Sequence, residues 1–116
     1  MPKPYIHFSR EEFSSRQQKT REHLQSLELD GLLLFKIEDM YWLTGYESDG
    51  FCIFGSMFIG TDGALTHLAR PADLGNISYS SICDDVRISP DTEDSTRAEH
   101  IKDMLRSLGM EGKKIG

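Results

Sequence analysis

Apolar residues at helical spacing dominate the first part of the chain. A set of less polar positions recurs at intervals of three, four or seven among Arg, Gln, Lys and Glu: Phe13, Thr20, Leu24 and Leu27. This spacing predicts an amphipathic surface helix from about Arg10 to Leu27. The sequence Ser9-Arg-Glu-Glu12 is typical of a capping box at the start of a helix.

Two apolar runs predict buried strands. Residues 32–35 read Leu-Leu-Leu-Phe, which is apolar on both faces and predicts a central buried strand. Residues 51–59 are almost wholly apolar and predict a second buried strand. Between the two runs, residues 37–44 favour a short helix that ends at Gly45. The tripeptide Thr61-Asp62-Gly63 indicates a hairpin turn, so residues 64–68 should return antiparallel to the second strand.

The second half of the chain alternates between helical and strand patterns. Arg70-Pro71 favours the start of a helix, which Leu74, Ile77 and Tyr79 can continue. Residues 85–88 read as a strand, and residues 90–94 as an acidic loop. A second capping box at Thr96-Arg-Ala-Glu99 precedes apolar residues on one helical face, and Gly109 is suited to end this helix: Ile101, Met104, Leu105 and Leu108.

Strands separated by helices, together with one hairpin, predict an α/β fold with a mixed sheet. The 116 residues suit one domain. Residues 113–116 resemble the first residues of a further strand, so we expect the chain to be part of a longer protein.

Charge and hydropathy narrow the classes of partner. The net charge is −6 and the basic residues are scattered, which disfavours nucleic acid as a partner. We see neither the apolar segment of a secretory signal nor a run long enough to cross a membrane. We therefore expect a cytoplasmic protein with neither nucleic acid nor membrane as its partner.

The sequence predicts no catalytic residue, metal site or cofactor within these residues. The four histidines are His7, His23, His67 and His100, and none pairs with another at helical spacing. The carboxylate clusters at Asp84-Asp85 and residues 91–94 are typical of solvated turns. Cys52 and Cys83 form no C-x-x-C motif, which favours buried free thiols.

Gly55-Ser56 lacks the second glycine of a G-x-S-x-G nucleophile elbow, so it does not predict a serine nucleophile.

Two side chains at the end of a predicted strand remain candidates for binding. His67 and Arg70 lie where a strand ends and a helix begins, a position that lines clefts in open α/β sheets. Arg70 either faces a substrate or a partner subunit, or it caps local carbonyls or pairs with Asp73, and we favour this local role.

Three aromatic residues allow two interpretations. Tyr41, Trp42 and Tyr46 could form a stacking surface, but we favour Trp42 in the core with the tyrosines at its rim.

The order of these elements resembles the N-terminal domain of the creatinase/prolidase/aminopeptidase P family. The most specific segment is Tyr41-Trp42-Leu43-Thr44-Gly45, which follows the first predicted strand. The resemblance implies one three-layer α/β/α domain over residues 1–116, with a ribonuclease-H-like mixed sheet. It also implies a separate C-terminal pita-bread domain that carries catalysis, with a divalent metal (Mn, Co or Zn) in the peptidases of the family.

The resemblance further implies a hydrolase acting on Xaa-Pro peptides or a related C–N bond. The N-terminal domain would form a homodimer, contact its own C-terminal catalytic domain and cover the partner subunit's active site. Creatinase has a substrate-contacting Phe-Gly-Arg segment, which Phe54-Gly55-Ser56 matches except for the arginine. Ser56 would hold a carboxylate less strongly than arginine does, which disfavours creatine.

The candidate substrate contacts are therefore Phe54, Ser56, His67 and Arg70. Other functions remain open: a freestanding small-molecule-binding or oligomerisation module, or a creatine amidinohydrolase-like domain. A ribonuclease-H-like nuclease would need clustered carboxylates on adjacent strands and a basic groove, and the sequence shows neither.

Overall fold

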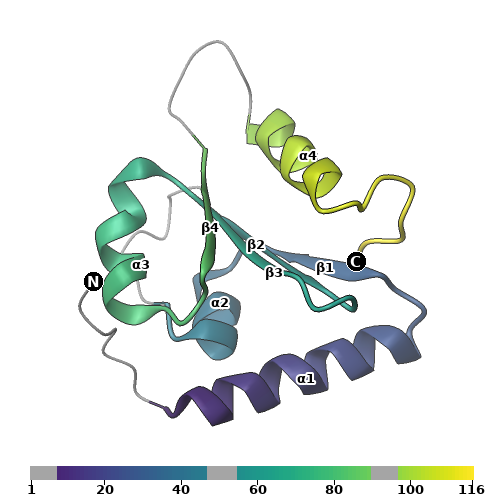
Figure 1. Cartoon of the computed structure of the whole chain (residues 1–116), viewed down its shortest axis with the longest axis horizontal. Helices are drawn as coiled ribbons and strands as arrows, with labels where there is room; N and C mark the ends of the chain where they lie inside the picture. The colour runs from purple at the N-terminus through teal and green to yellow at the C-terminus, as the bar shows by residue number, and fades with distance from the viewer. Residues whose placement is uncertain (1–7, 47–54, 90–96) are drawn as a thin grey trace.

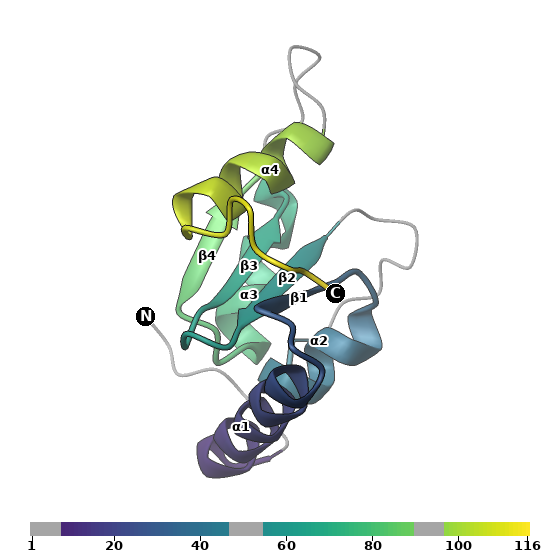
Figure 2. The same cartoon turned by 90° about the vertical axis from the view of Figure 1, so that its right-hand side faces the viewer.

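A four-stranded sheet lies between two layers of helices (Figure 1). The computed structural model describes residues 8–46, 55–89 and 97–116. Helices α1 (Arg10–Ser26), α2 (Ile37–Thr44) and α3 (Leu74–Ser80) cover one face of the sheet, which we call the three-helix face. Helix α4 (Arg97–Ser107) covers the opposite face, the α4 face (Figure 2). The predicted three-layer α/β arrangement is confirmed.

The sheet is mixed, as the sequence predicts. Its strands are β1 (Gly31–Leu34), β2 (Ser56–Gly60), β3 (Leu65–Ala69) and β4 (Asp85–Ile88), in the order β1-β2-β3-β4. The first three pair antiparallel, and β4 runs parallel to β3. A parallel pair needs a long crossover, which the 3-10 turn η1 (Pro71–Asp73) and α3 provide.

The prediction that residues 32–35 form a central buried strand is wrong. β1 is an end strand of the four-stranded sheet, and its three leucines are only half-buried. Its outer edge contacts the C-terminal residues, where Ile115 forms a parallel bridge with Gly31. The run is apolar on both faces because both helical layers extend over β1: Leu32 and Leu34 pack on the three-helix face, and Leu33 packs on the α4 face.

Local signals place the turns and helix ends correctly. The Ser9 hydroxyl accepts a hydrogen bond from the Glu12 backbone N–H at 3.1 Å. Gly45 ends α2 in the left-handed conformation, with a φ of 84°. Glycine adopts this conformation without the steric cost that other residues incur. The hairpin turn closes with the Gly60 N–H donating to the Ala64 carbonyl at 2.9 Å. The predictions for residues 51–54, residues 90–94 and Thr96 lie outside the described residues.

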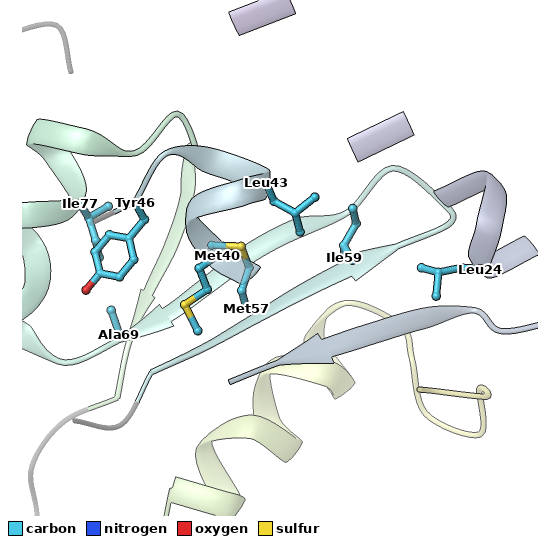
Figure 3. Close-up of a cluster of buried hydrophobic side chains, with 8 residues drawn as sticks. All are labelled: Leu24, Met40, Leu43, Tyr46, Met57, Ile59, Ala69 and Ile77. Atoms are coloured by element: carbon cyan, nitrogen blue, oxygen red, sulfur yellow. The ribbon is translucent and has the colours of Figure 1, made fainter. Parts of the chain in front are cut away.

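Alternation along the strands builds a separate core on each face. Met57 and Ile59 of β2 point to the three-helix face, and Phe58 between them points to the α4 face. The buried cluster on the three-helix face is shown in Figure 3: Leu24, Met40, Leu43, Tyr46, Met57, Ile59, Ala69 and Ile77. The cluster on the α4 face is smaller: Phe58, Leu68, Met104 and Met110.

The preferred placement of Trp42 in the core is wrong. Trp42 is 45% exposed, while Tyr46 is 4% exposed and belongs to the core. The periodicity of α2 explains the difference, because Met40, Leu43 and Thr44 are spaced i, i+3 and i+4 and all three are buried. Trp42 therefore lies on the opposite side of the helix.

Among the helices that the structure describes, none combines the length and apolar content that crossing a membrane requires.

Candidate functional site

The candidate contact residues Ser56 and His67 lie on opposite faces of the sheet. In the antiparallel β2–β3 pair, Ser56 is opposite Leu68 and Met57 is opposite His67. Directly opposed residues point to the same face. His67 therefore shares the three-helix face with Met57, and Ser56 shares the α4 face with Leu68. Phe54 lies outside the described residues, so the structure does not bring the four candidates together as one site.

Ser56, at the start of β2, is fully enclosed. Its side chain has no exposed surface, and its hydroxyl has no hydrogen-bond partner among the described residues. A buried hydroxyl without a partner destabilises the folded state by about 1–3 kcal/mol. Ser56 is therefore an unusual buried polar residue in the packing of the α4 face. Its predicted contact with substrate remains a prediction.

His67 is enclosed where β3 meets the end of α2. The side chain is 1% exposed, and its Nδ1 has no hydrogen-bond partner in the part of the chain that the structure describes. Its ring contacts the Tyr46 ring edge-on, with ring centroids 4.6 Å apart and an interplanar angle of 75°. Edge-to-face contacts of this kind suit aromatic rings in a core.

The surroundings of His67 favour the neutral imidazole. Burial lowers the pKa of His67 from 6.5 to about 4, and the negative charge of Asp73 opposes this shift only in part. His67 is therefore neutral at pH 7, so it can act as a hydrogen-bond partner but not as a fixed positive charge.

Arg70 makes a local ion pair, which confirms the interpretation favoured from the sequence. Its Nη2 lies 3.2 Å from Asp73 Oδ1, and its Nε donates to Asp73 Oδ2 at 3.3 Å. The Arg70 backbone N–H also donates to Asp73 Oδ2, so the two residues close the start of η1. Asp73 is 5% exposed, and this buried carboxylate engages the Arg70 guanidinium at the end of β3.

Cys83 is a buried free thiol, as the sequence predicts. Burial raises the pKa of Cys83 to about 12, and the nearby charges of Asp84 and Asp85 act in the same direction. Because the thiolate is the reactive form of cysteine, this thiol is inert at neutral pH. Cys52 lies outside the described residues.

A cleft of about 260 Å³ runs between β4 and α4, lined in part by Arg87, His100 and Asp103. Arg87 pairs with Asp85, with Nε 3.4 Å from Oδ1, and also donates to the Ser107 hydroxyl of α4. His100 Nδ1 contacts the hydroxyl of the buried Ser89. The polar groups of this cleft thus hold α4 against β4.

Within residues 8–46, 55–89 and 97–116, no three His, Cys, Asp or Glu side chains come close enough together to hold a metal ion.

Tyr46, the aromatic partner of His67, is the residue around His67 that the sequence interpretation misplaced. The helical spacing of α2 could have shown that Trp42 faces away from the core. The contact between Tyr46 and His67 has no local signal, because the two residues are brought together only by the packing of α2 on β3.

Comparison with known proteins gives a matching family model and a related enzyme. A family model described as the Creatinase/Prolidase N-terminal domain matches residues 16–116. The chain is 32% identical over 66 residues to an ectoine hydrolase from Halomonas elongata, and the match covers 57% of this chain and 16% of that protein.

Two solved structures share the fold. One is a dipeptidase from Pyrococcus horikoshii, with a TM-score of 0.67 and 18% identity over 82% of this chain and 25% of that chain. The other is the creatinase/prolidase N-terminal domain of an X-Pro dipeptidase from Streptococcus pyogenes. It has a TM-score of 0.63 and 17% identity over 78% of this chain and 67% of that chain.

Proposed function

Because this chain belongs to the creatinase/prolidase N-terminal domain family, we propose that it is the non-catalytic N-terminal domain of a hydrolase. The hydrolase would cleave a peptide bond or a related C–N bond. The observation that carries the proposal is the match over residues 16–116, combined with the small share of its relatives that the chain spans. That share is 16% of the ectoine hydrolase and 25% of the Pyrococcus dipeptidase.

In this proposal the reaction takes place on a C-terminal catalytic domain. That domain would carry the divalent metal, Mn, Co or Zn, as the resemblance to the peptidases of the family implies. The role of the N-terminal domain would be to dimerise and to cover the active site of the partner subunit. The substrate contacts predicted at Phe54, Ser56, His67 and Arg70 stay predictions, and Ser56 and His67 are buried on opposite faces of the sheet.

Phe8 and Trp42 form an exposed aromatic patch around the guanidinium of Arg16, and this patch supports a role in protein contacts. The Arg16 guanidinium lies 4.4 Å from the ring centroid of Phe8 and 5.3 Å from that of Trp42. Both rings are nearly half exposed. Trp, Phe and Arg are enriched at protein interfaces, so this patch is the proposed location of the dimer contact.

A hydrolysis assay tests the catalytic part of the proposal. We expect the purified 116-residue chain to release no product from Xaa-Pro dipeptides, ectoine or creatine with Mn²⁺, Co²⁺ or Zn²⁺, beyond a metal-only blank. Turnover by this chain would contradict a non-catalytic role. The same panel, given to a protein in which this chain precedes a C-terminal domain, should show metal-dependent hydrolysis.

Sedimentation analysis tests the dimer. We expect the chain to show a concentration-dependent dimer, and the Trp42→Ala variant to dissociate at concentrations where the original chain associates. Leu74→Ala is the matched control, because Leu74 is also 45% exposed but lies on α3. A monomer at all concentrations would count against dimerisation by this domain alone.

A further inference from the structure

His67 is the one histidine among the described residues that is fully buried, and its described neighbours compensate a positive charge on it poorly. Within that same part of the chain, its Nδ1 has no hydrogen-bond partner. Most buried polar atoms are hydrogen-bonded, so a buried imidazole nitrogen without a partner needs an explanation.

The groups around His67 come from several elements. Tyr46 follows α2, and its ring packs edge-on against the imidazole. On β2 and β4 its neighbours in the sheet are the apolar Met57 and Val86. After α3, the thiol of Cys83 interacts with the His67 backbone and stays protonated. None of these groups can neutralise an imidazolium.

Within the described part of the chain, Asp73 is the acidic group whose charge acts on His67, and it is already engaged. Its carboxylate receives hydrogen bonds from the Arg70 backbone N–H, Nε and Nη2. Asp85, on β4, is engaged as well. Its carboxylate accepts a hydrogen bond from the Thr66 hydroxyl at 2.7 Å and pairs with Arg87. A proton on His67 would therefore place a poorly compensated charge in the core, and such burial is strongly unfavourable.

The end of α2 is the element that can respond. Gly45 ends the helix, and its N–H donates to the Tyr41 carbonyl at 2.8 Å. Tyr46 follows directly, and its side chain packs beside Ile77 and Ala69 (Figure 3). If the Tyr46 ring moves away, water can reach the imidazole.

We propose that His67 and Tyr46 form an acid-sensitive latch, in which protonation of His67 releases the C-terminal end of α2 from the sheet. The latch is closed at neutral pH because the neutral imidazole packs against Tyr46. The unfolded chain takes up the proton below pH 6.5, whereas the folded state, with its lowered His67 pKa, resists it until about pH 4. Stability from His67 is thus fully present above the unfolded pKa and is lost as the pH falls toward the folded one.

Hydrogen exchange, corrected for the intrinsic effect of pH, tests the latch at about pH 7 and about pH 4.5. We expect the protection of the Gly45 and Tyr46 amides to fall about 10-fold or more and to lie below that of the Phe58 amide at about pH 4.5, because local opening exposes only the end of α2. The His67→Gln variant should show a smaller fall. His23→Gln is the matched control, since His23 lies on the exposed side of α1, and it should behave like the original chain.

Each result decides the question. A fall at Gly45 and Tyr46 that depends on His67 and leaves both less protected than Phe58 supports the latch. Equal protection of Gly45, Tyr46 and Phe58 at about pH 4.5 would mean that all three exchange by global unfolding and would overturn it, as would no change at all. If His67→Gln does not fold, NMR titration of the imidazole in the original chain decides instead. A ring that titrates near its ordinary pKa of 6.5 overturns the latch, and one that stays neutral well below that pH, with the Tyr46 ring signals shifting where it titrates, supports it.

Discussion

The two faces of the sheet are packed in different ways. The three-helix face buries a cluster of eight residues from α1, α2, α3, β2, β3 and Tyr46, and it also encloses the neutral His67. On the α4 face, the described residues include four buried apolar side chains with six partly buried ones packed against them, and polar contacts from Arg87 and Ser89 add to the docking of α4. Strands β2 and β3 supply both faces by alternation, so neighbouring residues in one strand serve different cores.

This difference indicates how the two helical layers contribute to stability. The three-helix face has a continuous cluster that spans several elements, so loss of one side chain leaves many contacts. Among the described residues, the α4 face has fewer fully buried side chains, and Phe58 is the one with no exposed surface in its cluster. Predictions that compare substitutions on the two faces therefore test whether a substitution in the smaller cluster lowers the free energy of unfolding more.

The largest effect is expected from truncating Phe58. Phe58→Ala should lower the free energy of unfolding by about 4 kcal/mol, because removal of a buried Phe side chain costs about 3–5 kcal/mol. Met57→Ala, the adjacent residue on the other face, should lower it by about 3 kcal/mol. Both side chains are 0% exposed. Urea denaturation gives the two values, and a larger loss for Met57→Ala would reverse the ranking of the faces.

Part of this arrangement could be predicted from the sequence. Helix α1, the hairpin turn and the α2 helix follow from spacing, capping and turn residues, which act over a few positions. The hairpin turn also fixes the register: a turn at residues 61–63 pairs Met57 with His67, so the opposite orientations of Ser56 and His67 were readable from the turn.

The remainder depends on contacts between distant segments. The end position of β1 follows from pairing with β2 and with Ile115, and a run of leucines is equally suited to an interior strand. The contact between Tyr46 and His67 joins residues that no local pattern connects. Long-range packing, rather than propensity, decides both features.

The next largest effect is expected at the end of α2. Gly45 has a φ of +84°, and a Cβ added there would lie 2.8 Å from the Ser80 carbonyl oxygen. Gly45→Ala should therefore cost about 3 kcal/mol, because backbone strain and overpacking add. Gly109, at the end of α4, has a φ of +76° but open space around the new Cβ. Gly109→Ala should cost only about 1 kcal/mol, from the strain alone. Thermal unfolding measures both, and equal losses would show that packing around Gly45 contributes nothing.

A smaller effect is expected from the arginines that join helices to the sheet. Arg21 of α1 donates to the Gly60, Gly63 and Ala64 carbonyls of the hairpin, at 2.9, 3.0 and 3.2 Å. Arg21→Ala should lower the free energy of unfolding by about 2 kcal/mol, since hydrogen bonds to charged groups are stronger than neutral ones. Arg87→Ala, on the α4 face, should cost less than about 1 kcal/mol, because both Arg87 and its partner Asp85 are partly exposed to solvent. Urea denaturation of both variants at low salt checks the order, which the opposite ranking would refute.

The smallest effect concerns two buried hydroxyls on the α4 face. The Ser56 hydroxyl has no partner among the described residues, whereas the equally buried Thr66 hydroxyl donates to Asp85 at 2.7 Å. Ser56→Ala removes a desolvated group with no hydrogen bond to lose, so stability should be unchanged or rise by up to about 1 kcal/mol. Thr66→Val should lower it by about 1 kcal/mol, because it breaks a bond to a charged acceptor. If Ser56→Ala is the more destabilising of the two in urea denaturation, the Ser56 hydroxyl has a partner in solution, such as an ordered water molecule, and the α4 face is better satisfied than its packing indicates.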